Sequence, residues 1–232
     1  MEQINGMTRI MRLLQFTDSA FPVGTFSFSN GLETAQFEGI VTDSKSLESF
    51  TRSQSHQAAF SDGVAAIHAH RAFLANDFES CRNIDSFLYR FKMNDEARQM
   101  AVRMGRKLSE LAQKLYDNQF INNLVTEIKG GTMKGMYPVV QGVIFALSGI
   151  DEKDLFCSHQ YGVINMVLGA ALRCVKVSHY DTQKIIDILS EETESLYDEA
   201  SKMDLKDMNA FYPQLDILAS LHEKGKMRMF MN

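Results

Sequence analysis

The chain has 232 residues, which is enough for one large domain or two small ones with a substantial core. Hydrophobic residues make up 45% of it, which excludes an intrinsically disordered protein. The net charge of −5 argues against nucleic acid as a partner, because phosphate binding requires a basic surface.

The first half of the chain is predicted to form helices with one prominent break. A first helix is expected over 7–17, with one apolar face formed by Met7, Ile10, Met11 and Leu14. The segment FPVG at 21–24 ends it, since proline fixes its own φ and disfavours helical geometry in the preceding residue. Asn30 followed by Glu33 predicts an N-cap and capping box for the next helix. Further helices are expected over 43–60, 64–74, 78–91 and 94–116.

The second half is also predicted to be helical, over 120–128, 137–149, 155–176, 185–196 and 213–224. The 155–176 helix is hydrophobic on most sides, so it is expected to be central. No window shows sustained two-residue alternation, the pattern typical of strands. The sequence therefore predicts an all-α, single-domain bundle of about ten helices around 155–176, with 1–232 as one domain.

Cysteine usage and hydropathy indicate a cytoplasmic protein. Cys81, Cys157 and Cys174 are widely spaced and form no CxxC pair, which favours free thiols in a reducing compartment. No secretory signal is recognisable at the N-terminus. The most apolar runs, 142–150 and 162–172, are shorter than the roughly 20 residues of a membrane span, so no membrane is expected as a partner.

No motif in the sequence indicates catalysis. GGTMKG at 130–135 resembles a phosphate-binding loop only superficially, because its spacing and context do not fit, and no GxSxG motif occurs. The six histidines lack metal-ligand spacing, so surface or capping histidines are favoured over a metal site. We therefore expect no catalytic residue, no metal and no cofactor.

Three segments are unusual for a simple bundle. The loop at 25–29 carries two aromatic rings, Phe26 and Phe28, and is either a buried plug or, as we favour, a contact surface. Small residues along 162–173 allow close helix approach, in a core or across a dimer interface. The end of the chain, 222–232, alternates basic and apolar residues and is either a frayed tail or a candidate partner-docking tail.

These segments also carry a family resemblance. LLQ at 13–15, DSAFPVG at 18–24 and GLE at 31–33 resemble the N-terminal signature of the urease accessory protein F family. Further similarity follows in the same order, at EAR (96–98), YPVVQG (137–142), GAALR (169–173), PQLDI (213–217) and RMF (228–230). It covers roughly 10–232. The family's PLGQTDGQ segment is reduced to KVSHYDTQ at 176–183, where only Asp181 and Gln183 remain.

The resemblance implies an all-helical, non-catalytic accessory protein of urease maturation that forms a homodimer. Such proteins bind a scaffold accessory protein of the D/H type, recruit and modulate the nickel-carrying GTPase of the G type, and serve nickel insertion into apo-urease. The residues implied to face the GTPase are Phe26, Ser27, Phe28, Ser29, Glu33, Asp181 and Gln183. Those implied to face the scaffold are the first helix and the tail residues Lys226, Arg228, Phe230 and Met231.

Two other interpretations stay open at this stage. One is a helical metal- or small-molecule-binding enzyme or sensor, with a pocket lined by Phe21, Phe26 and Phe28. The lack of clustered ionisable groups argues against it. The other is an oligomeric adaptor of another pathway.

Overall fold

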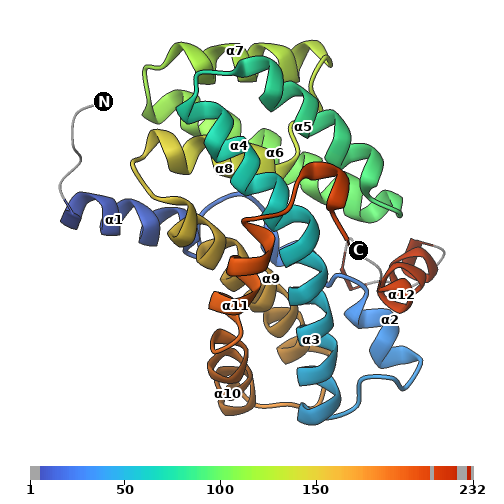
Figure 1. Ribbon diagram of the computed structural model, residues 1–232. Coiled ribbons are helices and arrows are strands. Elements are labelled where there is room, and N and C mark those ends of the chain that lie inside the picture. Colours follow the sequence, from blue (N-terminus) through green and yellow to red (C-terminus); the bar gives the residue numbers. More distant parts are fainter. Residues whose placement is uncertain (1–5, 210–211, 224–228, 231–232) are drawn as a thin grey trace.

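The computed structural model of the chain describes residues 6–209, 212–223 and 229–230. Within these residues there are twelve α-helices and no strand, which confirms the predicted all-α bundle (Figure 1). The helices are α1 (Gly6–Thr17), α2 (Leu32–Phe37), α3 (Ser44–Ala58), α4 (Val64–Leu74), α5 (Phe78–Phe91), α6 (Asp95–Leu115), α7 (Gln119–Gly130), α8 (Tyr137–Leu147), α9 (Glu152–Cys174), α10 (His179–Ser190), α11 (Thr193–Ala200) and α12 (Pro213–Glu223).

The closest helix contact joins α4 and α8. A β-carbon added to Gly142 of α8 would lie only 2.3 Å from the carbonyl oxygen of Ala66 in α4. Nine of the eleven residues of α8 are buried, so it packs on all sides. This pair forms the middle of the first of two hydrophobic clusters.

Helix α9 passes through both clusters, as expected for the central helix. Leu155 and Phe156 near its start belong to the first cluster, whereas Ile164, Val167 and Leu168 belong to the second. In the described part of the chain, α9 is the one helix long and apolar enough to cross a membrane. However, 56% of its apolar window is buried inside the fold, as in the core helix of a soluble protein.

Two local predictions are wrong. The capping box of Asn30 and Glu33 does not form, because α2 begins at Leu32 after two left-handed residues, Asn30 (φ 52°) and Gly31 (φ 77°). The predicted helix 185–196 is two helices, α10 and α11. Helix α10 begins earlier than predicted, since the Ser178 hydroxyl accepts a hydrogen bond from the Asp181 amide and caps its first turn.

The loop between α7 and α8 is fixed by a buried carboxylate that the sequence pattern did not single out. Asp85 of α5 is 1% exposed and accepts hydrogen bonds from the backbone amides of Lys134, Gly135 and Met136. Gly105 of α6 lies against this loop, where an added β-carbon would be 2.0 Å from the Gly135 carbonyl oxygen.

Candidate functional site

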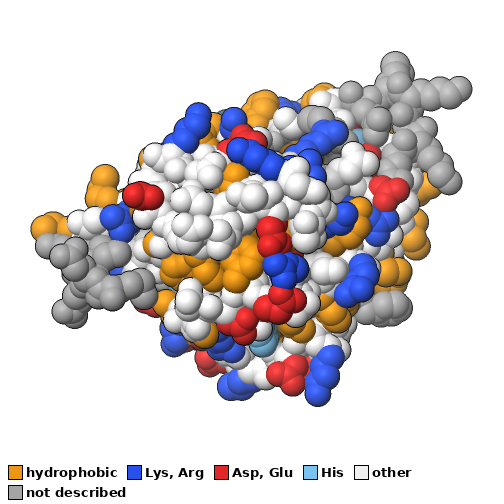
Figure 2. Space-filling model, turned by 90° about the horizontal axis from the view of Figure 1, so that it is seen from above, with side chains coloured by type: hydrophobic (Ala, Val, Ile, Leu, Met, Phe, Trp, Pro, Cys, Tyr) orange, Lys and Arg blue, Asp and Glu red, His pale blue; other side chains and the backbone are white. Residues whose placement is uncertain are grey.

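Helix α1 has an exposed apolar stripe on its outer face. Its inner side is mixed: Phe16 is buried in the first hydrophobic cluster, Arg9 pairs with Asp151 at 3.2 Å and with Asp154, and Arg12 donates to the Ser148 carbonyl oxygen at 3.2 Å. The residues of the outer face and their exposed fractions are Met7 (75%), Ile10 (49%), Met11 (66%) and Leu14 (59%). Figure 2 shows hydrophobic side chains beside the grey N-terminal residues at its left end, where α1 begins. A helix normally buries its apolar side, so this stripe is an unusually exposed apolar surface.

The aromatic loop after α1 divides its two rings between surface and core. Phe26 lies in a short 3-10 turn (Thr25–Ser27) and is 74% exposed, with Ser27 half-buried beside it. Phe28 and Ser29 are buried, and Phe28 belongs to the first hydrophobic cluster. Phe28 and Ser29 are therefore not on the surface of the described chain, and only Phe26 and Ser27 are available for contact.

Glu33 binds the end of the chain instead of capping its own helix. Its carboxylate accepts hydrogen bonds from the backbone amides of Met229 at 2.7 Å and Phe230 at 3.2 Å. It also lies 2.9 Å from Nε2 of His222. Partial burial by itself raises the pKa of Glu33, but the hydrogen bonds from His222, Met229 and Phe230 outweigh it and lower the pKa below its ordinary value.

His222 of α12 lies between two carboxylates. Its Nδ1 is 3.0 Å from the nearer oxygen of Glu96, at the start of α6, and its Nε2 faces Glu33. The side chain of His222 is 3% exposed, so the ring is buried with one carboxylate at each of its two nitrogens.

Phe230 is held by a cation from α9. It is 4% exposed, belongs to the second hydrophobic cluster, and its ring centre lies 4.1 Å from the guanidinium carbon of Arg173. The same guanidinium carbon lies 4.0 Å from the centre of the Phe26 ring, and Arg173 donates to the Phe26 carbonyl oxygen at 2.9 Å. One arginine therefore joins the aromatic loop to the end of the chain by two cation–π contacts. We call Glu33, Glu96, Arg173, His222 and Phe230 the C-terminal seam.

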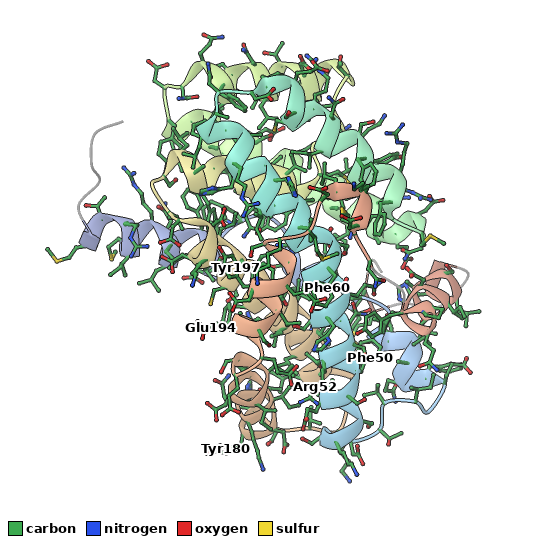
Figure 3. The ribbon with its side chains drawn as sticks, viewed as in Figure 1. Phe50, Arg52, Phe60, Tyr180, Glu194 and Tyr197 are labelled. Atoms are coloured by element: carbon green, nitrogen blue, oxygen red, sulfur yellow. The ribbon has the colours of Figure 1, made fainter. Side chains whose placement is uncertain are left out.

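The remaining predicted site residues lie elsewhere or outside the described residues. Asp181 accepts hydrogen bonds from the amide and hydroxyl of Ser178 at 2.8 and 2.6 Å, and Gln183 is exposed on α10. Helix α10 lies at the lower end of the bundle, away from α2 and α12, and Tyr180 points outward there (Figures 1 and 3). Lys226, Arg228 and Met231 lie outside the described residues.

Sequence reasoning missed the role of His222 and Arg173. No local pattern marks His222, because its partners Glu96 and Glu33 are 126 and 189 positions away in the chain. Arg173 lies in the 162–173 segment, whose small residues predict only close helix approach. The one clue in the sequence is Glu33, whose carboxylate could either cap its own helix or bind groups from another part of the chain.

The described residues offer little for a metal or a catalytic pocket. Among them, no group of three histidine, cysteine, aspartate or glutamate side chains is arranged to hold a metal ion. A cavity of about 760 Å³ lies between α3, α6, α9 and α12, but Phe21, Phe26 and Phe28 do not line it. His159 at its wall is buried, which lowers its pKa to about 4 and keeps the ring neutral near pH 7.

Comparison with known proteins identifies the family. The UreF family model matches residues 41–189. The urease accessory protein UreF 2 of Brucella canis is 44% identical over 223 residues, which covers 96% of this chain and 92% of that protein. The urease accessory protein UreF of Yersinia pseudotuberculosis is 40% identical over 223 residues, covering 96% of this chain and 98% of that protein. The resemblance seen in the sequence is thus confirmed, and the chain belongs to the UreF family of urease accessory proteins, which are not enzymes.

Proposed function

We propose that this protein is a cytoplasmic adaptor of urease maturation that binds a scaffold accessory protein of the D/H type. In that complex it recruits and modulates the nickel-carrying GTPase for nickel insertion into apo-urease. Family membership supports the process, since the relatives are named urease accessory proteins. The outward apolar face of α1 is the observation that carries the binding role.

The α1 face suits a partner that offers a hydrophobic groove. Its four exposed residues follow the i, i+3, i+4, i+7 spacing by which one helix side enters a groove. The salt bridges of Arg9 hold the helix on the body of the protein, so the stripe is presented in a fixed orientation. We assign this face to the scaffold accessory protein.

The GTPase is proposed to bind a second surface. Helix α10, which carries Asp181 and Gln183, lies on the other side of α3 from α2 and α12 (Figure 1). Phe26, Ser27 and Glu33 adjoin Phe230 through Arg173 and His222, so they belong with the tail rather than with α10. Residues 181–183 are therefore the better candidates for an independent GTPase contact.

Co-purification tests the scaffold assignment. Met11→Glu places a charge in the middle of the exposed stripe, and at least a tenfold loss of scaffold binding is expected, because a buried unpaired charge is strongly unfavourable at an interface. The matched control is Met93→Glu, where the same residue type is 77% exposed at the end of α5. Retention of full scaffold binding by Met11→Glu contradicts the assignment.

A homodimer is the second part of the proposal. Gly162 and Gly169 of α9 have no atom within 4 Å of an added β-carbon, and Tyr161 beside them is 40% exposed. A helix face with such small residues allows a second copy to approach closely. Gly169→Leu is expected to shift the purified protein from dimer to monomer in light scattering, and an unchanged dimer contradicts this interface.

A further inference from the structure

Residues 229–230 are bound by groups that recognise general features of a peptide. Glu33 accepts hydrogen bonds from two consecutive backbone amides at a bend, which any segment without proline at these two positions can supply. Arg173 and the second hydrophobic cluster hold one aromatic ring, that of Phe230. Met229, by contrast, is 61% exposed and contributes its backbone. The contacts thus select a bent chain with one aromatic side chain.

The recognising groups are held in place by residues outside the tail. Glu33 is fixed by His222, which is fixed in turn by Glu96. Arg173 is fixed by its hydrogen bond to the Phe26 carbonyl oxygen and by the Phe26 ring. None of these contacts requires residues 229–230, so the site stays formed when they leave. A site that is organised before its ligand arrives loses less entropy on binding.

We propose that this is a peptide-recognition site that the chain closes with its own residues 229–230. A segment of a partner protein that adopts the same bend and carries a phenylalanine or another aromatic residue displaces them and takes the same contacts. The free protein is then the closed form, and partner binding opens it. The biological meaning of this exchange rests on the proposed function, whereas the site itself can be tested with a peptide alone.

The linkage makes the chain's own segment a strong competitor. Residue 229 follows the end of α12 at Glu223 after five residues, and such a short connection gives an effective concentration of the order of millimolar. A free peptide at micromolar concentration therefore binds the wild-type chain poorly. Removal of the internal ring opens the site to the same peptide.

The experiment uses the full-length chain and a fluorescent synthetic peptide with the sequence of residues 224–232, KGKMRMFMN. Fluorescence polarisation is expected to show at least tenfold tighter binding to Phe230→Ala than to the wild type. Adding Glu33→Ala to that variant is expected to remove at least tenfold of the gain. Phe37→Ala is the matched control, because Phe37 is 83% exposed at the end of α2 and should bind peptide like the wild type.

Two further arms make the result decisive. Peptide carrying the Phe230→Ala change is expected to bind no variant, and equal binding of both peptides overturns the proposal. Equal affinity of wild type and Phe230→Ala for the native peptide also overturns it. Phe230→Leu keeps most of the buried volume and replaces Phe230→Ala if the latter does not fold.

Peptide binding without scaffold capture refutes the proposed function and leaves the site intact.

Discussion

Two contacts in this fold depend on different interactions. One joins α4 and α8, and the other joins α2 and α12 to residues 229–230. At the first contact, backbone approaches backbone at Gly142 with no room for another carbon. At the C-terminal seam, His222, two carboxylates and Arg173 meet one aromatic ring. Close apolar packing cannot be replaced by water, whereas charged groups and amide donors can exchange their partners for water. The first contact should therefore define the fold, and the second should open while the fold persists.

The largest effect is expected at the α4–α8 contact. A β-carbon at Gly142 would lie 2.3 Å from the Ala66 carbonyl oxygen and 3.0 Å from the His70 amide. We expect Gly142→Val to lower the free energy of unfolding by more than about 3 kcal/mol in urea denaturation. Gly130→Val at the end of α7 is the control, since its added β-carbon meets nothing within 4 Å. A similar loss in both variants would show that helical glycines in general, rather than this contact, are sensitive.

As the pH falls, protonation of His159 in α9 should lower the free energy of unfolding before the contacts of Glu33 in the C-terminal seam are lost. Burial lowers the pKa of His159 from 6.5 to about 4, so the folded protein keeps this ring neutral while the unfolded chain protonates it. Keeping the buried ring neutral therefore costs nothing above pH 6.5. As the pH falls from 6.5 to about 4, the free energy of unfolding decreases by about 3 kcal/mol. Urea denaturation at several pH values measures it, and His159→Gln should flatten the profile. An unchanged slope in His159→Gln refutes this assignment.

A smaller loss is expected from the centre of the seam. His222→Ala leaves the Glu33 and Glu96 carboxylates without the ring that hydrogen-bonds both of them, at a cost of about 2 kcal/mol in the free energy of unfolding. His179→Ala, at an exposed position in α10, should change it by less than about 0.5 kcal/mol. If the two substitutions have equal effects, the contacts of His222 do not stabilise the fold.

The smallest effect is expected from protonation of Glu33 at low pH, which should release residues 229–230. Its pKa is lowered in the folded protein from 4.5, so its contribution is complete above pH 4.5 and is lost as the pH falls through the lower folded value. The tail should therefore stay bound at pH 5, where the His159 contribution is already reduced. A fluorophore attached at residue 232 should report release only below pH 4.5, and release near pH 6 contradicts the role of Glu33.

Local patterns predicted most of the helices but not the seam. Caps such as Asp43 and Asn94 act within three residues, so the sequence shows them directly. The same local rule failed at Glu33, because His222 and the two tail amides compete for its carboxylate from the other end of the chain. The apolar face of α1 was predicted, but its outward direction depends on the contacts of Arg9 and Arg12 with residues 148–154.

Amide hydrogen exchange gives the most direct test that the seam opens without unfolding. In the wild type, the amides of Met229 and Phe230 should exchange through a local opening of lower free energy than that of Val143 and Ile144 in α8. Glu33→Ala should accelerate the first pair at least tenfold and leave the α8 pair unchanged. Exchange of all four amides at one common rate, or equal acceleration of both pairs, would contradict the account.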